Sequence, residues 1–107
     1  MALKNVEIGT SNTNVFDGTQ GTQYAFTVLL VTNTSGTNAT FTLYAIDGTD
    51  PVQTPANKNT ILKDIVVTAG DTFTLDTEKM VLGETDKIIA VSDTLNALNL
   101  TVSYVEL

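Results

Sequence analysis

Short runs of strand-forming residues, each followed by a polar turn cluster, extend along the whole chain. Threonine, a β-branched residue that fits a pleated strand, accounts for twenty of the 107 residues. The runs lie at 3–8, 15–16, 23–32, 40–47, 61–68, 72–75, 80–82, 87–92 and 98–107. This spacing predicts an all-β fold, an antiparallel two-sheet sandwich of about eight strands that is either immunoglobulin-like or jelly-roll-like.

Three of these runs carry more specific predictions. The run 23–32 is apolar on both faces in its second half, which indicates a strand covered twice or covered on one face by another subunit. One face is expected to carry Tyr24, Phe26, Val28 and Leu30, and the other Ala25, Leu29 and Val31. The glycine-containing turn 33–38 predicts a β-hairpin with the run 40–47. The run 61–68 also fits a helical stripe, but its β-branched residues favour a strand.

The length of 107 residues predicts a single domain over residues 1–107, long enough to bury one core without disulfides. A net charge of −7 argues against nucleic-acid binding through a basic patch. No apolar run approaches the ~18 residues of a membrane helix, and residues 1–5 lack the pattern of a secretory signal. We expect no nucleic acid and no membrane among the partners, and synthesis in the cytoplasm without processing.

The residue types that most enzymes use are missing, because the chain contains no His, Cys, Trp or Arg. It lacks the usual proton shuttle at neutral pH, the usual thiol nucleophile, and the imidazole and thiolate metal ligands. An enzyme would need a pair of carboxylates, and Asp71, Asp86 and Asp93 each lie beside a predicted strand end. Nothing in the sequence pairs them, and turns often carry aspartate. We expect no catalytic residues, no metal ligands and no cofactor.

The segment 47–57 is the longest predicted loop and carries both prolines. Its Asp47 and Asp50 could supply oxygen ligands to Ca²⁺, but the spacing and closing glutamate of an EF-hand loop are missing, and an ordinary turn is favoured. For protein contacts, we expect an exposed tyrosine and three aliphatic residues to form an apolar patch beside the two carboxylates. The candidate interaction residues are Leu29, Val31, Tyr44, Ile46, Asp47 and Asp50.

The excess of threonine has a structural explanation. Its hydroxyl keeps the solvent face of a strand wet, so we expect cross-strand threonine ladders on the outer faces. A sugar-binding face is the alternative. Such faces usually stack an aromatic ring on the sugar, and the chain has no Trp and only three Tyr.

The C-terminal part of the chain carries a recognisable progression of strands and turns. From Ile65 it reads IVVTAGDTFTL, continues MVLGETDKIIAVS, and ends NALNLTVSYVEL. This progression resembles small β-sandwich virion proteins of tailed bacteriophages, and the Phe-Thr-Leu-Tyr strand that ends at Asp47 is similar to the same group. The likeness covers the last half to two-thirds of the chain. The family pattern commonly has Ser-Gly where this chain has Ser103 and Tyr104.

The resemblance implies a non-enzymatic structural component of a phage particle, either a capsid decoration or cement protein or a neck or tail component. It implies partners among the other virion proteins, a homo-oligomer such as a trimer, and a location in the virion after synthesis in the host bacterial cytoplasm. The segment 9–22 would pack along a neighbour or form an ordinary loop. A carbohydrate-binding or adhesion module that uses Tyr44, Asp47 and Asp50 is the alternative function.

Overall fold

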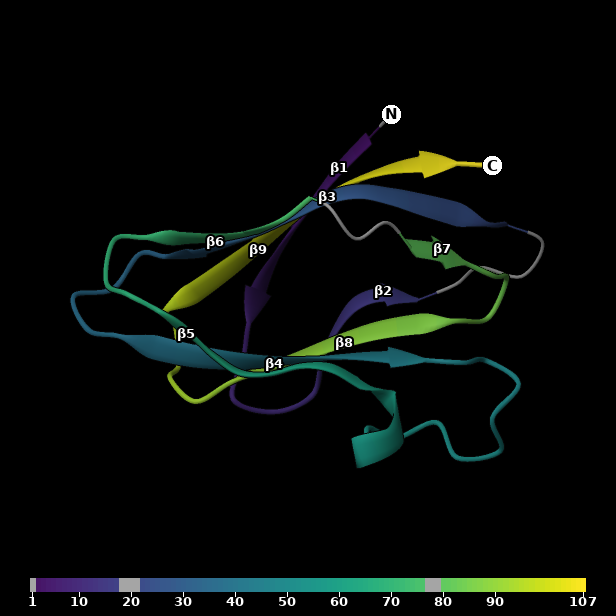
Figure 1. Ribbon diagram of the computed structural model, residues 1–107, viewed down its shortest axis with the longest axis horizontal. Coiled ribbons are helices and arrows are strands. Elements are labelled where there is room, and N and C mark those ends of the chain that lie inside the picture. The colour runs from purple at the N-terminus through teal and green to yellow at the C-terminus, as the bar shows by residue number, and fades with distance from the viewer. Residues whose placement is uncertain (1, 18–21, 77–79) are drawn as a thin grey trace.

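The computed structural model describes residues 2–17, 22–76 and 80–107, in which nine strands form two packed antiparallel sheets (Figure 1). The first sheet contains β1 (Ala2–Ile8), β9 (Leu98–Glu106), β3 (Tyr24–Asn33), β6 (Thr72–Leu75) and β7 (Met80–Leu82). The second sheet contains β2 (Thr13–Asp17), β8 (Lys87–Ser92), β4 (Ala39–Ile46) and β5 (Thr60–Val67). Within the described ranges the single helical element is a 3₁₀ turn, η1 (Asn57–Asn59). The predicted two-sheet sandwich is confirmed.

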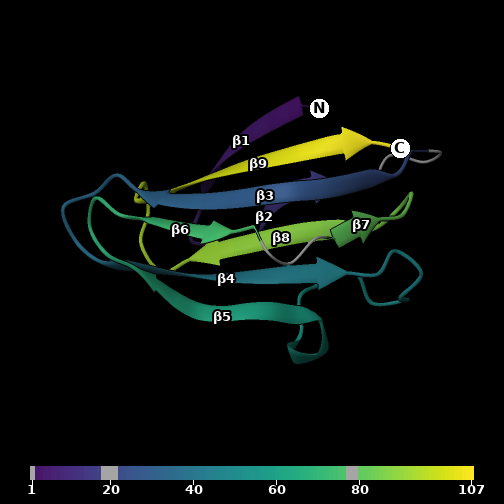
Figure 2. The same cartoon turned by 45° about the horizontal axis from the view of Figure 1, so that its top comes forward.

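The strand pairs are nested around the β4–β5 hairpin. β3 pairs with β6 and β7, β2 pairs with β8, and β1 pairs with β9, so the chain resembles one long hairpin that has been rolled up. The pairs β3–β9 and β4–β8 then complete the two sheets (Figure 2). This order is that of a jelly roll. An immunoglobulin-like sandwich keeps its first two strands in one sheet, whereas β1 and β2 lie in different sheets here.

The core lies between the sheets and is built from the inward-facing residues of both. Phe41 and Leu43 of β4 are fully buried, as are Leu98 and Leu100 of β9. At one end of the core, Phe16 makes edge-to-face contacts with the rings of Tyr24, Phe26 and Tyr104, with ring centroids 4.4 to 5.3 Å apart. The ammonium of Lys4 lies 5.1 Å from the centre of the Phe16 ring and covers this cluster at the β1 edge.

The predicted hairpin between the runs 23–32 and 40–47 is wrong, because β3 and β4 lie in different sheets. The reason is the fully buried Asn33 at the end of β3. Its side-chain amide donates to the carbonyl oxygens of Thr37 and Val67 at 2.8 and 2.9 Å. Its side-chain oxygen accepts from the backbone N–H and the hydroxyl of Ser35. These bonds fold the 34–38 connection into an arch that crosses between the sheets.

The predicted division of the run 23–32 into two faces is also wrong, because β3 contains a β-bulge. Phe26 pairs with Tyr104 and Val28 pairs with Ser103, so Thr27 is one extra residue in β3 relative to β9. The extra residue moves every later side chain to the opposite face. Tyr24 and Phe26 therefore share the inner face with the residues that the sequence places opposite them, namely Leu29 and Val31.

The ambiguous run 61–68 forms a strand, as predicted, but an irregular one. β5 pairs with β4 as Phe41 with Ile65 and as Leu43 with Leu62, which leaves one extra residue in β5. Asp64 in this bulge has φ = 49°, and its backbone N–H donates to the hydroxyl of Thr42 at 3.1 Å. The bulge disrupts the free edge of β5, so this edge is a poor template for another strand.

The segment 9–22 contains β2, which pairs with β8 at the edge of the second sheet. Over residues 13–17 it is therefore a strand of the sandwich and not the ordinary loop that is one of the two expectations. Residues 18–21 of the segment lie outside the described residues. The predicted runs 72–75, 80–82, 87–92 and 98–107 agree with β6 to β9, the last of which ends at Glu106.

Candidate functional site

The six predicted interaction residues do not form one exposed surface. Leu29 and Val31 are 3% and 0% exposed and belong to the core, where the bulge in β3 places them. Tyr44 and Ile46 alternate with core-facing residues of β4, so their side chains lie on the outer face of the second sheet. Ile46 is still only 1% exposed, and η1 contacts β4. The predicted apolar patch is therefore not present, and only Tyr44, Asp47 and Asp50 remain accessible.

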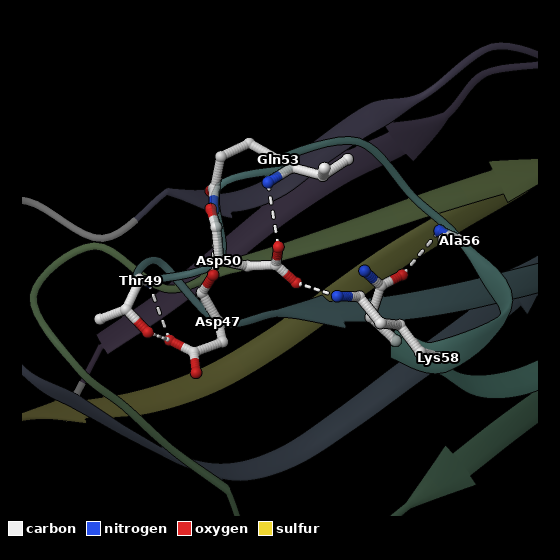
Figure 3. Close-up of polar contacts among 8 residues, drawn as sticks. Asp47, Thr49, Asp50, Gln53, Ala56 and Lys58 are labelled. Carbon is white, nitrogen blue, oxygen red and sulfur yellow. Dashed lines mark hydrogen bonds and ion pairs between the residues drawn. The ribbon is translucent and has the colours of Figure 1, made fainter.

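Asp47 and Asp50 hold the 47–59 loop in shape (Figure 3). One oxygen of the Asp47 carboxylate accepts from the backbone N–H and the hydroxyl of Thr49 at 2.9 and 2.8 Å. Asp50 accepts from the N–H of Val52 and forms an ion pair with Lys58, with a nitrogen–oxygen distance of 2.6 Å. Each carboxylate thus accepts a hydrogen bond from a backbone N–H two residues later in a tight turn, which is a common structural use of aspartate.

Asp86 joins this loop to the turn between β7 and β8. Its two carboxylate oxygens accept from the backbone N–H groups of Gly48 and Gly83, each at 2.8 Å. The approach is close, because a Cβ atom on Gly48 would lie 1.9 Å from the hydroxyl oxygen of Thr85. The sequence marks Asp86 only as one of several aspartates beside strands, and its partner Gly48 lies 38 residues away. Single-sequence patterns carry no signal for such a contact.

The electrostatics of these carboxylates match a structural use. The N–H and then the hydroxyl of Thr49 lower the pKa of Asp47 below its usual value. The ammonium of Lys58, followed by the N–H of Val52, lowers the pKa of Asp50. Both groups are therefore ionised at neutral pH. A general acid needs a raised pKa, and neither aspartate has one.

The three aspartates considered for carboxylate chemistry do not gather at one site. Asp93 accepts from the N–H of Thr40 at the start of β4, and Asp86 accepts from the N–H of Gly48 just beyond its end. Eight residues of extended chain separate these contacts by about 26 Å, several times the spacing of a glycosidase pair. The carbonyl oxygen of Asp71 accepts from the N–H of Asn33, the last residue of β3, and the Asp71 carboxylate accepts from the N–H of Thr72 at 2.8 Å. Among the described residues, no three acidic side chains group as metal ligands.

A shallow hollow of about 490 Å³ lies where the end of β4 faces β7. Aliphatic and thioether side chains and two carboxylates line it, namely Ala45, Ile46, Asp47, Met80, Val81, Leu82 and Asp86. The hollow is wide open to solvent, so it suits a protruding side chain of another protein better than an enclosed small molecule.

The outer face of the first sheet is the feature that the sequence reasoning missed. Strand alternation and pairing place four rows of side chains on it: Val105, Ala25 and Val81; Leu3, Ser103 and Val28; Asn5, Thr101, Leu30 and Thr74; Glu7, Asn99, Thr32 and Thr72. We call these fourteen positions the uncharged face, because thirteen of them carry uncharged residues and Glu7 is the one exception. The pattern could not be read beforehand, because the rows depend on the bulge in β3 and on which strands are neighbours.

Of the predicted threonine ladders, one cross-strand threonine pair is present on the polar half of this face, next to a threonine–asparagine pair. The hydroxyls of Thr32 and Thr72 are 3.1 Å apart across β3 and β6. The Thr101 hydroxyl donates to the side-chain oxygen of Asn5 at 2.8 Å across β9 and β1. These bonds fix the polar rows on the surface of the sheet.

No protein-family model matches the chain, and no curated protein matches it significantly in sequence. Across residues 2–17, 22–76 and 80–107, the structure contains no helix with the length and apolar character needed to cross a bilayer.

Proposed function

We propose that the chain is a non-enzymatic structural protein of a tailed-phage particle, either a capsid decoration or cement protein or a component of the neck or tail. The jelly-roll strand order carries this proposal, because viral capsid proteins repeatedly use that order. The residues that resemble phage virion proteins, from Ile65 onward, correspond to the last three residues of β5 and to β6 through β9. These strands supply one or more partners to every other strand of the sandwich.

The use of polar groups supports a protein that acts through its surfaces. Asp47, Asp50 and Asp86 each accept backbone hydrogen bonds that hold turns, and Asp93 joins the turn after β8 to β4. The open hollow beside Asp47 and the broad outer face of the first sheet are both suited to protein contacts. We propose the other virion proteins and copies of the chain as partners, and the virion as its location.

Binding to particles tests the proposal. Particles of the phage that encodes the chain would be prepared from a mutant that lacks the gene, and purified protein would be added back. We expect the protein to sediment with these particles at a fixed, saturable ratio. Protein that stays in the supernatant at every concentration contradicts the proposal. Particles of an unrelated phage serve as the control, since binding to them indicates nonspecific adsorption.

A carbohydrate-binding module is the second candidate, because lectins also use the jelly roll and the accessible Tyr44 lies on the strand that leads into the 47–59 loop. A glycan array, probed with and without Ca²⁺, distinguishes the two functions. Glycan binding that the double variant D47N/D50N loses would favour this candidate. Absence of binding to every glycan would favour the structural role.

A further inference from the structure

We propose that the uncharged face is the surface through which two copies of this chain associate, with the outer face of one first sheet packed on that of the other. This dimer rests on the proposed function, which places the chain in a virion. It adds to that function a partner, the second copy of the chain, and the surface through which the two copies bind. It depends on three observations about this face: its apolar rows, its charge and its size.

The first observation is a continuous group of aliphatic side chains on the uncharged face. Val105, Ala25 and Val81 form one row across β9, β3 and β7, and Leu3 and Val28 flank Ser103 in the next row. Leu3 and Val81 are 69% and 65% exposed. Leu30 continues the group into the third row. The largest apolar patch on a soluble protein is often a functional contact surface, and this group is a candidate for one.

The second observation concerns charge. The chain carries a net charge of −7, so most contacts between two copies would bring acidic groups together. The uncharged face holds only one of the twelve acidic residues, Glu7, at the end of its last row. The outer side of the second sheet is different, because Lys63 and Asp64 are exposed on β5. Two copies can therefore meet on the uncharged face with few like charges opposed, namely those of Glu7 and of the exposed Asp76 that follows β6.

The third observation is the size of the face. With about 4.8 Å between strands and about 6.8 Å between rows, each position covers about 33 Å², so the fourteen positions cover about 460 Å² on each copy. Two such faces bury about 900 Å², which is the size of a weak, transient interface. A contact of this size gives a weak, concentration-dependent dimer, which assembly on a particle can strengthen through multiple attachment.

Sedimentation velocity of the purified chain over a range of concentrations tests the inference. We expect the mass to rise from 11.4 kDa toward twice that value as the concentration increases. Higher salt should strengthen the dimer, because salt screens the repulsion between two acidic copies and leaves apolar contacts in place. A contact made by charge pairs would weaken instead. A chain that remains monomeric at every concentration, or that forms trimers, overturns the inference.

A matched pair of variants locates the surface. The double variant L3E/V81E adds two charges to the uncharged face and should weaken association by more than about tenfold, since like charges across an interface repel. The double variant V66E/L95E adds the same charge at positions that are 60% and 64% exposed elsewhere, and it should associate like the wild type. Equal effects of the two double variants, or no effect of L3E/V81E, overturn the proposed surface.

Dimerisation and particle binding can be tested independently of each other. A monomeric chain that still sediments with its particles contradicts the dimer and leaves the particle role in place. A chain that dimerises through the uncharged face without binding particles contradicts the particle role alone.

Discussion

The side-chain amide of Asn33, at the end of β3 in the first sheet, donates a 2.9 Å hydrogen bond to the carbonyl oxygen of Val67, the last residue of β5 in the second sheet. Asn33 is fully buried, and its four side-chain bonds also hold the arch between β3 and β4. One polar side chain thus connects the two layers at the point where the chain crosses between them. A hairpin at this position would keep β4 in the first sheet and change the topology.

Replacing Asn33 by alanine should therefore destabilise the fold strongly. The variant N33A leaves the carbonyl groups of Thr37 and Val67 without these partners, and we expect a loss of about 2–4 kcal/mol in the free energy of unfolding. Urea denaturation measures the loss. The variant N38A is the control, because exposed Asn38 accepts one bond from the N–H of Ala69 and should cost less than about 1 kcal/mol. Equal losses would contradict the role given to Asn33.

The contact between Gly48 and the β7–β8 turn predicts a second difference. In G48A the new methyl group would overlap Thr85, so the loop must move, and we expect a loss of about 1–3 kcal/mol. The control G36A adds a methyl group at a position with open space around it and should change stability by less than about 0.5 kcal/mol. Thermal unfolding of both variants, monitored by circular dichroism, makes the comparison. A fully stable G48A would contradict the observed loop position.

The burial of Leu29 separates a core role from an interaction role. The variant L29A should lose about 2–5 kcal/mol of stability, because it opens a cavity among packed side chains. The variant L95A removes the same atoms from an exposed leucine and should change stability by less than about 0.5 kcal/mol. Urea midpoints measure both effects. A stable L29A variant would place Leu29 on the surface, as the sequence alone suggested.

Asp93 predicts a pH dependence. The backbone N–H of Thr40, with the hydroxyl of Thr94, lowers the pKa of Asp93 in the folded chain below its ordinary value of 3.8. As pH falls, the carboxylate of Asp93 therefore takes up a proton in the unfolded chain before it does so in the folded chain. Its stabilisation of the folded state is complete only at pH values above the ordinary pKa. Its contribution is lost as pH falls through the lowered pKa.

The variant D93N tests this dependence, because asparagine keeps a hydrogen-bond acceptor but does not titrate. Urea unfolding at several pH values between neutrality and strong acid should show the wild type losing more stability than D93N below the ordinary pKa. The two proteins should behave alike in their pH dependence above it. If the wild type and D93N lost the same stability in acid, Asp93 would not contribute to the pH dependence of unfolding.

The local features of the sequence predicted the strands and the sandwich well, because alternation is a property of neighbouring residues. The run from Leu98 to Tyr104 alternates strictly and forms β9. The β-branched run that begins at Ile61 forms β5. Its bulge at Asp64 has no local signal, since a positive φ at aspartate depends on the partner strand.

The wrong predictions concern long-range pairing. A glycine-containing turn normally indicates a hairpin, but the buried bonds of Asn33 to Val67 depend on a strand 34 residues away. The extra residue Thr27 reverses the faces of β3, so Leu29 belongs to the core and Leu30 to the uncharged face. The same shift buries Leu29 and Val31 of the predicted interaction patch, whereas Ile46 is buried where η1 contacts β4. The surface that replaces the patch becomes visible only once the strand register is known.

The most direct test of the proposed role is quantitative mass spectrometry of purified particles from the phage that encodes the chain. The account predicts that the chain is present in intact, gradient-purified particles at a constant number of copies per major capsid protein. Finding it only in the soluble fraction of the lysate, and absent from the particles, would contradict the account.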